Sequence, residues 1–201
     1  MIAALADCPH TQRIRFAKQH DVDGAYVYDM YSDYATHGDL SNLVHRYSNS
    51  STQIPESFIW HVFAALADAI HTMKTGHCAS KASSRQRKKH RQSRTAKPSV
   101  TQARQPLPTT QHIVHLDIKP ANVFLHAPNQ SSYSHPVLAD FGITQYQGPE
   151  LDVHAARLQG DLGTEGYMAP EITNEKLHHH AVTSAADVWS TGMVMCRMMN
   201  A

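Results

Sequence analysis

Hydrophobic and polar positions follow two different periods along the first part of this 201-residue chain. Two short runs at 13–18 and 25–31 are enriched in β-branched and aromatic residues, and the turn-like segment 20–24 between them predicts a β-hairpin. From about 55 to 74 the apolar residues recur at steps of three and four, which is typical of a helix that buries one face. The residues on that face would be Ile59, Phe63, Leu66, Ile70 and Met73.

Further ordered elements are predicted in the second half of the chain. An apolar pattern resumes at 113–115, and the run 136–139 resembles a strand that ends at Asp140. The periodic stretch 185–199 predicts a helix with a large apolar face. Two predicted helices are thus accompanied by short predicted strands, and a carboxylate directly follows one strand.

The segment 77–111 has a different composition, dominated by Ser, Thr, Gln, Pro and basic residues. Nine of the chain's 18 Lys and Arg residues lie within 81–104, where there is no acidic residue, so the formal net charge of +1 hides an acidic remainder. Such a segment cannot bury enough apolar surface to offset the entropy lost on ordering. We expect a disordered basic insertion at 77–111.

The sequence shows no targeting or membrane-spanning signal. No uncharged apolar run approaches the roughly 20 residues that a spanning helix needs, so we expect a soluble, intracellular protein. The three cysteines (Cys8, Cys78 and Cys196) are far apart in sequence and lack Cys-x-x-Cys spacing, which favours neither a disulfide framework nor a zinc ribbon. They are expected to be reduced, inert thiols.

Three motifs carry the candidate chemistry. The segment 115–122 (HLDIKPAN) places an acid, a cation two residues later and an amide five residues later in a loop constrained by Pro120. A second carboxylate follows the predicted strand in Asp140-Phe141-Gly142. The third motif, 163–171 (GTEGYMAPE), completes the ordered set.

These motifs, in this order, resemble the large lobe of the eukaryotic protein kinases of the Ser/Thr type. Residues 187–192 (DVWSTG) resemble the following helix, whose Asp supports the catalytic loop, and 33–40 (DYATHGDL) resemble the hinge on which adenine docks. The resemblance implies an α+β, protein kinase-like fold with a mostly helical C-terminal lobe and remnant small-lobe strands.

The resemblance also implies roles for individual residues. Phosphoryl transfer requires positioning and charge neutralisation. Asp117 would accept the proton of the substrate hydroxyl, Lys119 would neutralise the transferring phosphate, and Thr164 would bond both. Hard oxygen ligands from Asn122 and Asp140 would hold Mg²⁺.

The implied cofactors are therefore ATP and Mg²⁺, with Asp33 and Ala35 of the hinge also contributing to ATP binding. The implied partner is a protein substrate. Lys at position 119 is typical of the serine/threonine kinases rather than the tyrosine kinases.

Two departures from the family pattern shape the expected organisation. Nothing before residue 30 resembles a Gly-x-Gly-x-x-Gly turn or a Val-Ala-x-Lys strand, and the chain stops at Ala201. We expect residues 1–34 to be a remnant of the small lobe with the start of the hinge, and residues 35–201 to be a large lobe truncated at its C-terminal end. The chain is then either part of an active Ser/Thr kinase or a catalytically inactive pseudokinase-like scaffold or incomplete gene product.

Leu116 occupies the position where most of these kinases have an arginine that clamps an activation-loop phosphate. Consistently, residues 145–163 contain no Ser or Thr. The sequence predicts that no Ser/Thr phosphate in that segment regulates the protein, which leaves Tyr146 and Thr144 as nearby acceptors.

For the basic segment 81–104, three interpretations remain open: a passive spacer, a signal for the nuclear import machinery, or a contact with a polyanion. It has no interleaved aromatic residues, so a nucleic acid would be bound through its phosphates alone. The expected localisation is cytoplasmic, nuclear or both, and the oligomeric state is not indicated.

Overall fold

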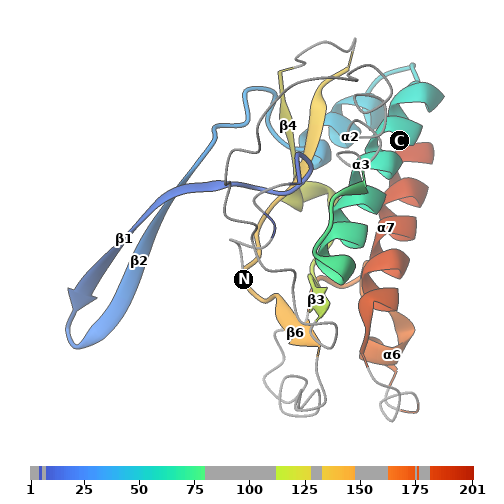
Figure 1. Cartoon of the computed structure of the whole chain (residues 1–201). Helices are drawn as coiled ribbons and strands as arrows, with labels where there is room; N and C mark the ends of the chain where they lie inside the picture. Colours follow the sequence, from blue (N-terminus) through green and yellow to red (C-terminus); the bar gives the residue numbers. More distant parts are fainter. Residues whose placement is uncertain are drawn as a thin grey trace, which may run out of the picture.

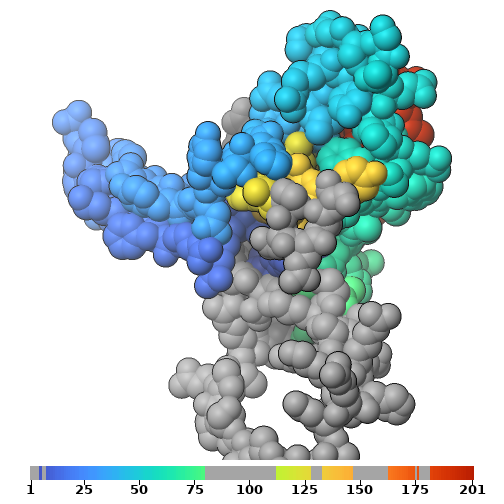
Figure 2. All heavy atoms as spheres, turned by 90° about the horizontal axis from the view of Figure 1, so that it is seen from above, coloured from blue at the N-terminus to red at the C-terminus, as the bar shows by residue number. Residues whose placement is uncertain are grey.

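The first two strands form the predicted hairpin. In this computed structural model, which describes residues 5, 8–79, 112–127, 133–147, 163–174, 176 and 182–201, β1 (Ile14–Val22) pairs antiparallel with β2 (Ala25–Ser32). The strands are longer than predicted because Asp23 and Gly24 alone make the turn, both at positive φ, as a tight hairpin requires. The hairpin projects away from the rest of the molecule (Figures 1 and 2).

Two long helices lie side by side and form much of the core (Figure 1). They are α3 (Glu56–Thr75) and α7 (Ser184–Met199), both within one residue of the predicted bounds. Helix α3 ends where Gly76 adopts the left-handed conformation, with φ of 72°, and its N–H caps the helix.

The predicted buried face of α3 is correct except at Phe63. Leu66, Ile70 and Met73 are buried and Ile59 is partly buried against the core, but Phe63 is 40% exposed. Phe58 and Val62 are additional core residues of this helix. The physical reason is the aromatic partner that each phenylalanine contacts. Phe58 packs on Tyr133, whereas Phe63 contacts Trp60 edge-on at the surface.

Short strands and helices connect these elements. β3 (His112–Val114) pairs with β6 (Gln145–Gln147), and β4 (Val123–His126) pairs with β5 (His135–Leu138), both antiparallel. Helix α2 (Leu40–Ser48) begins at Asp39, whose side chain caps it by accepting from the Asn42 N–H. A 3₁₀ turn η1 (Pro120–Asn122) leads into β4, and α6 (Pro170–Thr173) precedes α7.

The β4–β5 pair positions the candidate site. Its two free edges are bonded by irregular segments: the Gln12 N–H donates to the Leu138 carbonyl, and the Leu125 N–H donates to the Gly38 carbonyl. β4 begins directly after the predicted catalytic loop, and β5 ends just before Asp140. Because Val123 pairs with Leu138, the two motifs lie at the same end of the strand pair.

Several predictions fall wholly or partly outside the described residues. The predicted insertion 77–111 is described only at 77–79 and the segment 145–163 only at 145–147 and 163, while the basic stretch 81–104 lies entirely outside. The domain boundary at 34/35 falls just after β2 and stays a prediction. Within the described part of the chain, no helix is both long enough and apolar enough to cross a membrane.

Candidate active site

The loop between β3 and η1 is held by a buried carboxylate on α7. Asp187 is fully buried, and its two oxygens accept the backbone N–H groups of His115 at 2.8 Å and Leu116 at 3.0 Å. Burial raises the pKa of Asp187 to about 6. One side chain thus satisfies two buried donors that have no strand partner and fixes the start of the loop.

His115 links the same loop to the segment before Asp140. Its side chain is fully buried, with Nε2 3.0 Å from the Ala139 carbonyl and Nδ1 accepting from the Asp117 N–H at 3.3 Å. A neutral imidazole that carries its proton on Nε2 satisfies both bonds. Burial lowers the pKa of His115 to about 4, which keeps the ring neutral at ordinary pH.

Asp117, Lys119 and Thr164 form a closed set of contacts. The Thr164 hydroxyl donates to Asp117 Oδ1 at 2.6 Å and accepts from Lys119 Nζ at 2.7 Å. Lys119 Nζ also lies 2.8 Å from Asp117 Oδ2. Both charged side chains are largely buried, with exposed fractions of 12% for Asp117 and 24% for Lys119, so the charges interact in a partly dehydrated environment.

Thr164 reaches this position because a glycine precedes it. Gly163 has φ of +96°, and a Cβ at that position would lie 2.5 Å from the Leu116 carbonyl oxygen. The backbone of 163–164 can approach the loop this closely only without a side chain at 163.

Asn122 and Asp140, the predicted Mg²⁺ ligands, lie on two segments that a backbone hydrogen bond joins. The Asn122 amide nitrogen donates to the carbonyl and to Oδ2 of Asp117, both at 2.9 Å, which leaves the amide oxygen as the group that can face a cation. The Asn122 carbonyl accepts from the N–H of Ala139, the residue before Asp140. Asp140 is exposed and adopts a left-handed φ of 62°. An amide oxygen and a carboxylate fit the oxygen chemistry of Mg²⁺.

The two hinge residues line a separate hollow. Asp33 and Ala35 lie along a hollow of about 480 Å³ between the end of β2 and Phe124 on β4. The Asp33 carboxylate makes a two-pronged bond with the guanidinium of Arg15, at 2.8 and 2.7 Å, which lowers the pKa of Asp33. This side chain is therefore occupied within the hairpin, and a ligand in the hollow would meet the backbone of 33–35.

Leu116 has an apolar role that its sequence position did not reveal. It adopts a left-handed φ of 72° and is 5% exposed. Its side chain belongs to a cluster of buried residues from β3, from α6 and α7, and from the residues that precede these two helices: Val114, Ala169, Ile172, Val182 and Ala186. The residue that interrupts the family's Arg pattern therefore packs the loop onto the segment around α6.

A second group that sequence reasoning missed lies away from this site. Cys8, Asp68 and Cys78 offer ligand atoms that all lie within 4.8 Å of one another, a contact that the sequence did not indicate, while the predicted reduced state of the two cysteines agrees with the structure. Their separation of 70 residues in the chain concealed the contact. The signal that could have found it is the position of Cys78 just after α3, the helix that carries Asp68.

Comparison with known families gives a direct assignment. The family model described as the protein kinase domain matches residues 84–201, more than half of the chain. The chain belongs to the protein kinase family. The predicted family and the α+β, kinase-like fold are thereby confirmed, and the contacts around Asp117 lie in the matched region.

Named relatives of this kinase chain are serine/threonine and cell-cycle kinases. It is 27% identical over 191 residues to the G2-specific protein kinase fin1 of Schizosaccharomyces pombe and 24% identical over 192 residues to the G2-specific protein kinase nimA of Emericella nidulans. Each alignment covers 95% of this chain, but only 22% and 24% of the relative. The serine/threonine-protein kinase/endoribonuclease IRE2 of Homo sapiens is 39% identical over 83 residues, covering 41% of this chain and 9% of the relative. The chain thus spans a quarter or less of these relatives.

Proposed function

We propose that this kinase chain takes part in the transfer of the γ-phosphate of ATP to serine or threonine hydroxyls of a protein substrate. The observation that carries the proposal is the set of contacts among Asp117, Lys119 and Thr164, in which the carboxylate, the ammonium and the hydroxyl bond one another. Fixed charges of this kind act by positioning and by stabilising the charge that develops during transfer.

Asp117 is the group that orients the substrate hydroxyl and accepts its proton. Its Oδ1 is held by Thr164 and its Oδ2 by Asn122 and Lys119, so the carboxylate cannot rotate freely. Both oxygens retain lone pairs, so a substrate O–H could donate to either. Thr164 and Asn122 thereby serve as positioning residues.

Lys119 supplies the positive charge that the transferring phosphate needs. Its ammonium already bridges Asp117 and Thr164, so it lies beside the atom that takes the proton. Mg²⁺, when bound through Asn122 and Asp140, would supply the remaining neutralisation of the phosphate oxygens. The serine/threonine preference is supported by Lys119 and by similarity to relatives such as the serine/threonine-protein kinase/endoribonuclease IRE2.

ATP is proposed to place its adenine against the backbone of Asp33 and Ala35. Support comes from the hollow that both residues line, and from the engagement of the Asp33 side chain with Arg15, which leaves the backbone groups to the ligand.

The test is a phosphotransfer assay on the 201-residue chain with ATP, Mg²⁺ and a Ser/Thr-containing protein substrate. Asp117→Asn should reduce the rate by about 10²–10⁴-fold, because the amide accepts no proton. Asp23→Asn is the matched control: it makes the same chemical change at an exposed hairpin turn where Asn tolerates the positive φ, so the rate should not change.

A parallel thermal-shift measurement with ATP and Mg²⁺ separates catalysis from binding. Transfer that survives Asp117→Asn unchanged would contradict the catalytic assignment. A nucleotide-dependent shift without any transfer by the unaltered chain would favour the non-catalytic, scaffold interpretation instead.

Localisation in the cytoplasm, the nucleus or both stays a prediction. For the basic segment, the nuclear import hypothesis is tested by a fusion in which Arg87, Lys88, Lys89 and Arg91 are all changed to Gln. An unchanged distribution in cells would contradict it, leaving the spacer and polyanion alternatives.

A further inference from the structure

Three potential metal ligands from separate segments meet beside α3. Cys8 precedes β1, Asp68 lies in α3, and Cys78 follows α3, and one ligand atom from each lies within 4.8 Å of the others. Cys8 is 4% exposed, and the other two are partly buried. Neither cysteine forms a disulfide bond in the structure.

The chemistry of this set matches a thiophilic divalent cation. Thiolate sulfur and carboxylate oxygen are established ligands of Zn²⁺, and tetrahedral bonds of about 2.3 Å would place the two sulfurs about 3.8 Å apart. The three groups therefore need to move by no more than about 1 Å to share one ion. The hard-oxygen pair Asn122 and Asp140, in contrast, lacks any sulfur and suits Mg²⁺.

Neighbouring groups already orient the ligands. The Ala79 N–H donates to Asp68 Oδ1 at 3.0 Å, and the Cys78 S–H points to Asp68 Oδ2 at 3.5 Å. Loss of the thiol proton on metal binding would release both Cys78 Sγ and Asp68 Oδ2 toward the cation, while Ala79 keeps the carboxylate in place. Burial raises the pKa of the Cys8 thiol to about 11, and hydrogen bonds from Thr72 and from the backbone of His10 offset only part of that effect, so the cation would have to displace the Cys8 proton.

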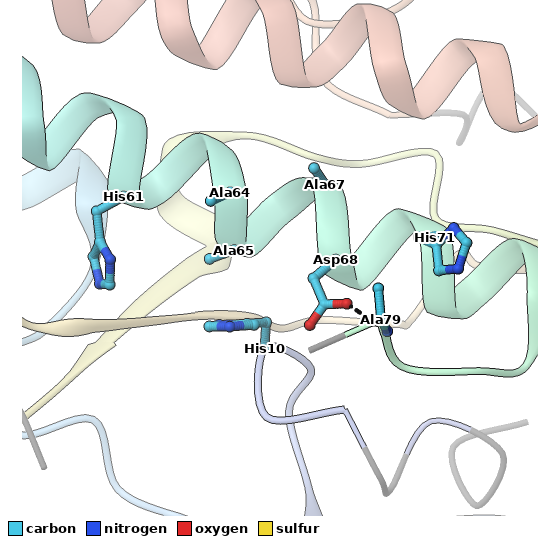
Figure 3. A pocket seen from close by; sticks show the side chains of 8 residues that line it. All are labelled: His10, His61, Ala64, Ala65, Ala67, Asp68, His71 and Ala79. Atoms are coloured by element: carbon cyan, nitrogen blue, oxygen red, sulfur yellow. Dashed lines mark hydrogen bonds between the residues drawn. The ribbon is translucent and has the colours of Figure 1, made fainter. Parts of the chain in front are cut away.

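An open space beside the cluster gives access to it. A hollow of about 430 Å³ is lined by Asp68 together with three histidines, His10, His61 and His71. Figure 3 shows the Asp68 carboxylate turned toward Ala79 at the edge of this space, with the His10 ring lying along its floor. The hollow can therefore supply both an entry path and a water molecule as a fourth ligand.

We propose that Cys8, Asp68 and Cys78 bind one Zn²⁺ ion, with water from the adjacent hollow as the fourth ligand. The bound ion would fasten the segment before β1 to α3 and to the residues that lead into the basic stretch 81–104. It would thereby join parts of the chain that the catalytic contacts do not reach, and it does not depend on phosphoryl transfer.

The experiment titrates the reduced 201-residue chain with Co²⁺, used as a spectroscopic probe, and then with Zn²⁺. One equivalent of Co²⁺ should produce thiolate-to-cobalt charge-transfer absorption together with the visible bands of a tetrahedral ion, and Zn²⁺ should remove both. Zn²⁺ should also raise the melting temperature of the unaltered chain.

Variants assign the ligands. Cys78→Ser should abolish the charge-transfer band, and Asp68→Asn should weaken Co²⁺ binding at least about 10-fold. Cys196→Ser, at an exposed cysteine on α7, should bind Co²⁺ as the unaltered chain does. Cys78 is chosen over the buried Cys8 because its replacement is less disruptive to folding.

The proposal is overturned if the reduced chain shows no cobalt–thiolate absorption, or if Cys78→Ser binds Co²⁺ with unchanged affinity and spectrum. A chain that is isolated with a Cys8–Cys78 disulfide, and that binds no metal after reduction, would likewise overturn it in favour of a covalent link.

Discussion

The loop at 115–122 and the β1–β2 hairpin are stabilised in opposite ways. The loop takes its bonds from residues far along the chain, such as Asp187 on α7 and Thr164. The hairpin is bonded along its own two strands, and its large side chains are exposed, including Tyr26 at 69% and Met30 at 62%. The geometry of the site is therefore a property of the whole fold, whereas the hairpin's conformation is local.

The largest effect is expected where one remote side chain holds the loop. Asp187→Ala would leave the buried N–H groups of His115 and Leu116 without an acceptor, which should lower the free energy of unfolding by about 2–5 kcal/mol. Urea denaturation measures this loss. The matched control, Asp29→Ala on the exposed face of β2, should change it by less than about 0.5 kcal/mol. Equal losses in the two variants would remove the contrast between loop and hairpin.

A smaller effect is expected at Gly163, where space and conformation both exclude a side chain. Gly163→Ala and Gly166→Ala each place Ala at a positive φ, of +96° and +85°, which costs about 1–2 kcal/mol. Only at 163 does the added Cβ meet a backbone atom, the Leu116 carbonyl oxygen, while nothing lies within 4 Å of it at 166. The 163 variant should therefore lose at least about 1 kcal/mol more in urea denaturation. If the two variants unfold at the same urea concentration, the close approach of residues 163–164 to the loop is refuted.

The burial of His115 predicts how the free energy of unfolding changes with pH. The pKa of His115 is about 4 in the folded chain against 6.5 for the free side chain, so its contribution is fully present above about pH 6.5 and is lost as the pH falls toward 4. Asp187, with a pKa raised to about 6, acts in the opposite direction over part of this range. The two shifts therefore partly cancel in the unaltered chain.

Comparison with His115→Gln isolates the histidine, because the other titrating groups are common to both proteins. The stability difference between the unaltered chain and the variant should shrink by about 2 kcal/mol between pH 7.5 and pH 5. Urea denaturation at both pH values measures it. A difference independent of pH would mean that the folded and unfolded histidine titrate alike.

The smallest effect is expected in the hairpin. Tyr26→Thr retains a residue suited to a strand at a position that is 69% exposed, so the free energy of unfolding should change by less than about 0.5 kcal/mol. Leu138→Ala, at a fully buried position in β5, should cost about 2–5 kcal/mol. A large loss for Tyr26→Thr would show that the hairpin contributes to the stability of the body after all.

Local pattern predicted the elements well and their packing less well. The hairpin and both long helices follow from the hydrophobic periodicity and the turn residues. The deeper burial of Phe58 than of Ile59, in contrast, depends on Tyr133, which is 75 residues away from Phe58. Spacing alone does not contain that information.

The motifs predicted which polar residues meet, and the structure brings Asp117, Lys119 and Thr164 into contact. What a motif could not predict was the engagement of Asp33 with Arg15 or the meeting of Cys8 with Cys78, since neither pair belongs to a recurring pattern. Contacts that arise from one chain's own tertiary structure are visible only once that structure is known.

The apolar surroundings of Leu116 determine which conditions weaken the contact between the loop at 115–122 and the segment around α6. A clamp made of an arginine and a phosphate weakens as ionic strength rises and disappears when a phosphatase acts. The cluster of Leu116 with Ala169 and Ile172 carries no charge, so neither added salt nor dephosphorylation can loosen it. Cooling weakens hydrophobic contacts and would therefore weaken this cluster. The contact of Leu116 with the segment around α6 should thus respond to temperature rather than to phosphorylation.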